Sequence, residues 1–178
     1  MINFIQRRRK LSFGISFAFL IAAGSLMRPS SVCLKTDVTP IAILDIEFAF
    51  DQHRADVIRD TWIKTTCEYG TALKAAQINI AWDFLFIIAY VIFFIVLISL
   101  LVPLKARFGQ SLMIYMAVLA GLLDVIENIF MFLFLRGADF SSLLFSVPAT
   151  MKFTLVFLLV SSLVAFLVSK VFTFTANK

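Results

Sequence analysis

The sequence predicts an all-α fold: a bundle of four transmembrane helices with one amphipathic segment on the outer side of the membrane. Of the 178 residues, 61% are hydrophobic and 15% are charged, whereas soluble domains are nearer half apolar and a quarter charged. Four separate apolar runs are about as long as a helix needs to cross a hydrocarbon core roughly 30 Å thick. Lys and Arg gather at the ends of these runs. We therefore expect a single membrane domain that comprises residues 1–178.

The predicted helices cover residues 11–27, 78–104, 111–135 and 149–172. The first run is at the short limit for a span, and the second and third are long enough to cross with some tilt. The fourth carries Lys152 and Lys170 near its ends, where a long side chain can extend to the membrane interface. All four prolines lie outside or at the ends of the runs, so we expect helices that stop at their edges without central kinks.

Positive charge sets the predicted orientation, because Lys and Arg are enriched in the short cytoplasmic segments of membrane proteins. Basic residues precede the first run, occupy the connection between the second and third, and follow the fourth. Both termini are therefore expected in the cytoplasm, with segment 28–77 on the outer side. The first run also resembles a signal peptide. Cleavage after Gly24 would leave three helices, but the apolar run continues past that residue, which favours an intact first helix.

Segment 28–77 is the long part of the chain expected in water. Asp45 and Glu47 alternate with apolar residues, a pattern typical of a short strand or of a stretch that lies on the membrane interface. Asp51 can cap a helix of about 15 residues that rests on the membrane or on the bundle. The apolar face of this helix comprises Ala55, Ile58 and Trp62.

The two cysteines, Cys33 and Cys67, both fall in this outer segment, so a disulfide between them would tie it down in an oxidising compartment. Neither has the spacing of a zinc site, and a single histidine, His53, excludes a His-rich metal or haem site. The net charge of +5 is explained by the basic ends of the apolar runs. We therefore expect no nucleic-acid partner.

Three acidic residues, Asp83, Asp124 and Glu127, lie within the runs expected in the hydrocarbon core, where charges are costly and usually face the bundle interior. Asp124, Glu127 and Asn128 share one helical face because of their i, i+3, i+4 spacing. Helical rise places Tyr90 of the second helix level with Asp124, and Asp83 shares the face of Tyr90. We therefore predict that these five residues form a cluster between the second and third helices, open to the outer side.

No Lys or Arg is expected at that depth, so burial and repulsion should keep at least one carboxyl group protonated, unless a bound cation compensates. The cluster is then either hydrogen-bonded glue between helices or a binding site. The ligand of such a site is a cation, a proton or a polar lipid head group. A third interpretation is catalysis on a lipid or peptide, with Asp124 and Glu127 as acid and base. Glu47 and Arg54 are further candidate members of the site.

Two aspartates on adjacent helices also invite comparison with intramembrane aspartyl proteases, which pair one Asp with a Gly-x-Gly-Asp motif. Here Leu123 replaces the second glycine before Asp124. Asp83 also lies about 10 Å shallower than Asp124 by helical rise, whereas two carboxyl groups that share a proton must be close. The sequence therefore disfavours this mechanism.

Four stretches of the chain carry a family resemblance: Ile43 to Ala49, His53 to Trp62, Asp83 to Tyr90 and Ala120 to Asn128. Together they resemble the corresponding stretches of an uncharacterised group of small bacterial four-helix membrane proteins. The most specific parts are the D-F-L-F motif at Asp83 and the D-x-x-E-N motif at Asp124, whereas Ile46 and His53 depart mildly from the pattern. The resemblance covers most of residues 40–128 and groups the candidate residues into one set. This set comprises Glu47, Arg54, Trp62, Asp83, Tyr90, Asp124, Glu127 and Asn128.

Together these observations predict a multi-pass protein of the bacterial inner membrane that binds its ligand without catalysis. The expected partners are the lipid bilayer and a larger membrane complex, of which the protein is a subunit or a transporter accessory. The alternative is an intramembrane enzyme with an Asp/Glu acid–base pair. The sequence identifies neither the ligand nor a cofactor, and the resemblance implies no activity.

Overall fold

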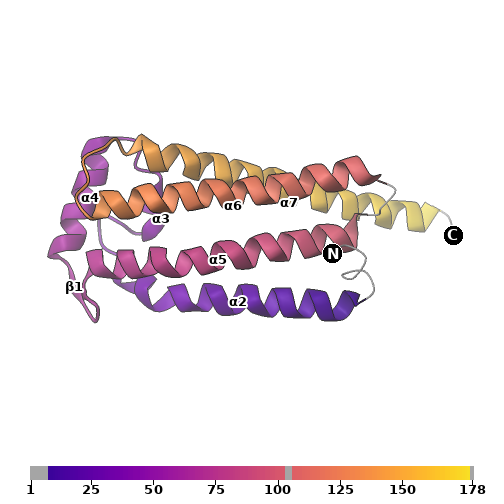
Figure 1. Cartoon of the computed structure of the whole chain (residues 1–178), viewed down its shortest axis with the longest axis horizontal. Helices are drawn as coiled ribbons and strands as arrows, with labels where there is room; N and C mark the ends of the chain where they lie inside the picture. Colours follow the sequence, from indigo (N-terminus) through magenta and orange to yellow (C-terminus); the bar gives the residue numbers. More distant parts are fainter. Residues whose placement is uncertain (1–7, 103–105, 177–178) are drawn as a thin grey trace.

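Four long helices lie side by side in the computed structural model, which describes residues 8–102 and 106–176 (Figure 1). They are α2 (Arg9–Cys33), α5 (Ala72–Leu101), α6 (Arg107–Leu135) and α7 (Leu143–Ala176). Each is long and apolar enough to cross a membrane. The predicted all-α four-helix bundle is therefore confirmed, and the four spans support a multi-pass membrane protein.

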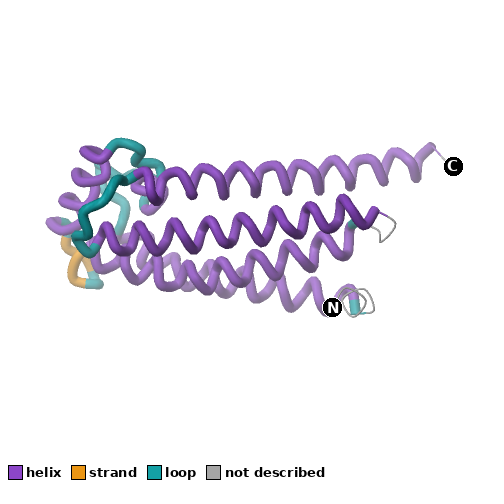
Figure 2. The backbone as a smooth tube through the Cα atoms, turned by 45° about the horizontal axis from the view of Figure 1, so that its top comes forward, coloured by secondary structure: helices purple, strands orange, loops and turns teal. Residues whose placement is uncertain are grey.

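The long helices pack in chain order: α2 against α5, α5 against α6, and α6 against α7. Because of this order, α2 and α7 form the two edges of the group (Figures 1 and 2). The segment between α2 and α5 covers one end of the bundle, which we call the capped end. This segment contains α3 (Ile43–Glu47), α4 (Gln52–Lys64) and the paired two-residue strands β1 (Thr66–Cys67) and β2 (Gly70–Thr71).

Three long helices extend further toward the capped end than the sequence analysis predicts. α2 continues past residue 27 to Cys33, α5 begins at Ala72 rather than at residue 78, and α7 begins at Leu143 rather than at residue 149. Pro29 and Pro148 therefore lie inside helices, and the expectation that every proline lies outside or at a helix end is wrong for these two. Each proline removes one backbone hydrogen bond from its helix, and both prolines lie within six residues of the helix end at the cap.

The cap begins with a helix where a strand or an interfacial stretch was expected. The carboxylate of Asp45 accepts a hydrogen bond from the Ile41 N–H at 2.8 Å, which satisfies a backbone donor just before α3. The prediction for α4 is confirmed, because Asp51 accepts a hydrogen bond from the Arg54 N–H at 3.0 Å, as an N-cap residue does. The predicted apolar face of α4 packs on the bundle and is fully buried.

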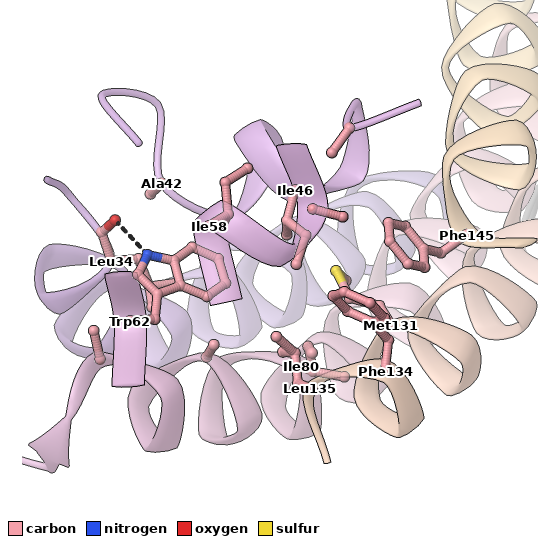
Figure 3. Close-up of a cluster of buried hydrophobic side chains, with 14 of the residues drawn as sticks. Leu34, Ala42, Ile46, Ile58, Trp62, Ile80, Met131, Phe134, Leu135 and Phe145 are labelled. Carbon is pink, nitrogen blue, oxygen red and sulfur yellow. Dashed lines mark hydrogen bonds between the residues drawn. The ribbon is translucent and has the colours of Figure 1, made fainter. Parts of the chain in front are cut away.

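Trp62 of α4 lies beside Leu34 in the buried cluster between cap and bundle (Figure 3). Its indole N–H donates to the Leu34 carbonyl and to Thr39 Oγ1, both at 3.2 Å, so the buried ring leaves no polar atom unsatisfied. A disulfide between Cys33 and Cys67 joins the end of α2 to β1. The cap is therefore held to the bundle by apolar packing, buried hydrogen bonds and one covalent link.

Small residues on α6 allow α5 to approach closely, as the stripe of Ala117, Ala120 and Gly121 indicates. Both alanines are fully buried. A Cβ atom on Gly121 would lie 2.6 Å from Val91 Cγ2 of α5, which is far inside van der Waals contact. The closeness of α5 and α6 therefore requires glycine at this position.

We predict that Gly121→Ala destabilises the protein, because the β-branched Val91 side chain cannot move aside without straining its neighbours. Gly109→Ala is the matched control on the same helix, since a Cβ atom there meets nothing within 4 Å. Thermal unfolding in detergent should show Gly121→Ala less stable than Gly109→Ala by roughly 1–3 kcal/mol. Equal stability of the two variants would contradict the close approach.

Candidate functional site

Two hydrogen bonds join α5 to α6 within the spanning part of the bundle. The Tyr90 hydroxyl donates to Asp124 Oδ2 at 3.0 Å, and Asn128 Nδ2 donates to Asp83 Oδ2 at 2.6 Å. Tyr90 is therefore level with Asp124, and the predicted packing of these two helical faces is confirmed. The seven-residue spacing on α5 and the four-residue spacing on α6 bring the partners together because each spans whole helical turns.

A buried ammonium group lies among the acidic residues. Lys152 Nζ of α7 is 2.7 Å from Asp124 Oδ1, 2.7 Å from Glu127 Oε2 and 3.6 Å from Glu47 Oε2. The Lys152 residue is only 7% exposed. The expectation that no Lys or Arg neutralises the intramembrane carboxylates is therefore wrong. Lys152 also does not extend to the interface, because α7 begins at Leu143 and places it roughly 14 Å along the helix.

The cluster holds more negative than positive groups. Glu47, Asp83, Asp124 and Glu127 supply carboxyl groups, and Lys152 supplies the ammonium. Neither Glu47 Oε2 nor Glu127 Oε1 has a hydrogen-bond partner among the described residues, although both atoms are buried. Unpaired charge in such surroundings is costly, so the cluster gains from a bound proton or from a ligand that brings positive charge.

Glu47 connects the cap to this cluster. It lies in α3 of the cap and is 6% exposed. Its carboxylate is directed toward Lys152 of α7. Burial raises the pKa of its carboxyl group from 4.5 to about 7, and repulsion from Asp124 and Asp83 adds to the rise while Lys152 opposes it. Glu47 is therefore a group that gains or loses a proton near neutral pH.

A cavity of about 430 Å³ adjoins the cluster. This volume is common for small-molecule sites. Its polar wall is formed by Glu47, Asn79, Asp83, Tyr90, Asp124, Asn128 and Lys152. Its apolar wall comes from α2, α3, α5 and α7, with Leu20, Met27, Phe86, Phe93, Phe153 and Val156 among its residues. The cavity is thus polar on one side and apolar on the other.

Asn79 is a polar residue of this cavity that the sequence analysis missed. Its Nδ2 lies 3.0 Å from the Met27 carbonyl, 2.9 Å from Ser30 Oγ and 2.8 Å from Ser31 Oγ. Its Oδ1 is buried without a partner in the described structure, and the residue is 1% exposed. Asn79 lies at the edge of the span predicted to begin at residue 78, so its side chain is not expected inside the bundle. The sequence signal that could have identified Asn79 is an amide side chain near the start of one helix, together with Ser30 and Ser31 near the end of the preceding helix.

The structure brings most, but not all, of the candidate residues to the cavity. Glu47, Asp83, Tyr90, Asp124 and Asn128 line it. Glu127 does not line the cavity and contacts it only through Lys152. Arg54 also lies elsewhere: its side chain is 53% exposed and pairs with Asp45 at 3.6 Å.

No group of three or more His, Cys, Asp or Glu residues within residues 8–102 and 106–176 is arranged to hold a metal ion. The polar wall instead combines carboxylates, amides, a phenol and an ammonium, which together can bind an organic polar group or exchange protons. Fold and site thus define a four-helix membrane-spanning bundle with a capped, acidic cavity. Comparison of the chain with protein-family models, with curated proteins and with solved structures found no match.

We predict that Lys152→Met destabilises the protein by roughly 3–5 kcal/mol, because it leaves Asp124 and Glu127 as uncompensated buried charges. The loss should be larger at pH 8 than at pH 5, since protonation of the carboxyl groups removes the repulsion. Lys35→Met, at an exposed position, is the control. Thermal unfolding of both variants at the two pH values measures this difference. Equal stability of the two variants would contradict the central role of Lys152.

Glu47 should make stability depend on pH. The folded protein binds the Glu47 proton more tightly than the unfolded chain does. The resulting stabilisation is full below pH 4.5, declines between pH 4.5 and about 7, and is absent above that range. We predict that the free energy of unfolding of wild type, relative to that of Glu47→Gln, falls by roughly 1–3 kcal/mol as the pH rises through this window. Unfolding measured against pH, with Glu68→Gln as control, tests this; parallel curves for wild type and Glu47→Gln would contradict it.

Proposed function

We propose that this protein binds the polar head of an amphipathic membrane molecule at the acidic cluster and holds its apolar part in the adjoining cavity. The observation that carries the proposal is the division of the cavity into a polar wall and an apolar wall. A membrane lipid or lipid-like molecule has the same division. Binding buries apolar surface of the ligand while the cluster satisfies its head group.

The position of the cavity supports access from the membrane. Its apolar wall includes Leu20 and Met27 of α2 on one side and Phe153 and Val156 of α7 on the other. α2 and α7 are the two edges of the helix group. We infer that the cavity opens sideways between these edges, toward the lipid.

An amphipathic ligand fits the cluster better than a bare cation or a proton alone, which the sequence analysis left open. Lys152 already places one positive charge against Asp124 and Glu127, and it repels a small cation from the same oxygens. A ligand with an apolar part gains additional free energy from the apolar wall, which a metal ion or proton leaves empty. Structural glue alone would likewise leave the cavity without a role.

Catalysis by Asp124 and Glu127 has less support from this geometry. A general acid or base must reach its substrate within hydrogen-bonding distance or through one water. Asp124 lines the cavity, but Glu127, which pairs with Lys152, does not. An acid–base pair would therefore need a different partner for Asp124.

We assign the capped end to the outer face of a bacterial inner membrane. This assignment rests on the basic residues before α2 and between α5 and α6, which the positive-inside rule places in the cytoplasm. The cavity then draws its ligand from the outer leaflet, because Lys152 and Asp124 lie in the half of the bundle nearest the cap. Membership of a larger membrane complex stays a prediction.

Native mass spectrometry of protein purified in mild detergent tests the proposed function. We predict that wild type carries a bound amphiphile, which Val156→Trp loses because the indole fills the cavity. Val164→Trp is the matched control, since Val164 is 53% exposed on the same helix and does not line the cavity. Thermal unfolding of each variant establishes that it is folded. Absence of any bound species from wild type, or equal retention by Val156→Trp, would overturn the proposal.

A further inference from the structure

The hydrogen-bond donors of the polar wall are already engaged. The Tyr90 hydroxyl donates to Asp124, and Asn128 Nδ2 donates to Asp83. The Lys152 ammonium lies between Asp124 and Glu127, with Glu47 nearby. A ligand that needs donors from this wall, such as a phosphate or a carboxylate, must compete with these carboxylates for them.

The acceptors, in contrast, are in excess. Asn79 and Glu47 line the cavity, and their buried atoms Asn79 Oδ1 and Glu47 Oε2 have no hydrogen-bond partner among the described residues, although Lys152 Nζ lies 3.6 Å from Glu47 Oε2. The orientation of the Asn79 amide is fixed by its surroundings, because its Nδ2 faces three oxygens of α2. A buried acceptor without a donor is costly. A ligand that brings N–H or O–H donors relieves this cost at both atoms.

Charge narrows the head group further. The cluster has four carboxyl groups and one ammonium, so a second positive charge brings it closer to balance. An anionic head group meets repulsion from the same carboxylates. Positive charge and several donors on one small group are together the properties of a primary ammonium.

The apolar part of the cavity sets the tail. At about 430 Å³, the cavity lies toward the lower end of small-molecule sites, which span roughly 300–1,000 Å³. This volume suits one hydrocarbon chain. The wall beside Tyr90 is aromatic, with the Phe86 ring centroid 5.7 Å and the Phe94 centroid 6.3 Å from that of Tyr90.

Resting on the proposed function, we propose that the cavity selects an amphiphile with a primary ammonium head, whose N–H groups donate to Asn79 Oδ1 and Glu47 Oε2. The hydrocarbon chain beside the head lies between α2 and α7. The same chemistry occurs in a free long-chain amine and in a lipid with a primary-amine head.

A series of four probes with one tail separates charge from hydrogen bonding. Dodecylamine has both positive charge and N–H donors, dodecyltrimethylammonium has the charge alone, dodecanol has one neutral donor, and dodecanoate is an anion. Binding to purified wild type is measured by native mass spectrometry in a maltoside detergent. We expect dodecylamine to bind at least tenfold more tightly than each of the other three.

Variants locate the binding to the two acceptors. Glu47→Gln should weaken dodecylamine binding at least tenfold and change dodecanol binding less, because it removes the charge and keeps the shape. Glu68 does not line the cavity, so the Glu68→Gln variant should bind dodecylamine as tightly as wild type does. Asn79→Ala, checked for folding by thermal unfolding, should also weaken dodecylamine binding. Competition by phosphatidylethanolamine in nanodiscs, but not by phosphatidylcholine, indicates a lipid source; no competition indicates a free amine.

The outcomes separate this inference from the proposed function. Equal binding of dodecyltrimethylammonium or dodecanoate, or unchanged dodecylamine binding in Glu47→Gln, overturns the ammonium assignment and leaves an amphiphile site. The same holds if none of the four probes binds but another amphiphile co-purifies with wild type. If no probe binds and nothing co-purifies, both the ammonium assignment and the proposed function fail.

Discussion

The contact of the Lys152 ammonium with Asp124 and Glu127 is the interaction on which the interior of this bundle depends. These carboxylates on α6 are separated from water by apolar helices, and a charge left alone there costs several kcal/mol. Lys152 reaches them from α7 with both distances at 2.7 Å. The pair therefore fixes the relative position of α6 and α7 along their axes, because sliding either helix by one turn would separate the charges by about 5 Å.

The same ammonium ties the spanning helices to the cap through Glu47, 3.6 Å away. The cap also has its own anchors, the disulfide from Cys33 and the buried indole of Trp62. These anchors lie beside α2 and α5, whereas Glu47 faces α6 and α7. The cap consequently closes the polar end of the cavity. It is anchored by the disulfide and the Trp62 hydrogen bonds on the side of α2 and α5, and by the ion pair of Glu47 on the side of α6 and α7.

Helical periodicity predicted the part of the site that lies within single helices. Spacings of three, four and seven residues placed Asp124, Asn128, Asp83 and Tyr90 correctly on facing sides, because those spacings depend only on the geometry of an α-helix. Helix ends depend on tertiary contacts that hydropathy does not report. A fourth helix that begins at residue 149 predicts Lys152 at the interface, and a second helix that begins at residue 78 predicts Asn79 at a helix end. The structure instead begins α7 at Leu143 and α5 at Ala72, which places both side chains inside the bundle. Short segments such as α3 have too few residues for a period to be recognised.

The roles of glue and binding site are compatible in this cluster, and the distribution of hydrogen bonds shows why. The cross-helix contacts use donors: the Tyr90 hydroxyl, the Asn128 amide and the Lys152 ammonium. A bundle held together in this way satisfies its carboxylates only in part. Acceptors without a hydrogen-bond donor among the described residues remain on Glu47 and Asn79, two residues that line the cavity. The interactions that hold the helices together thereby determine what a ligand must supply to the cavity, namely hydrogen-bond donors that carry positive charge.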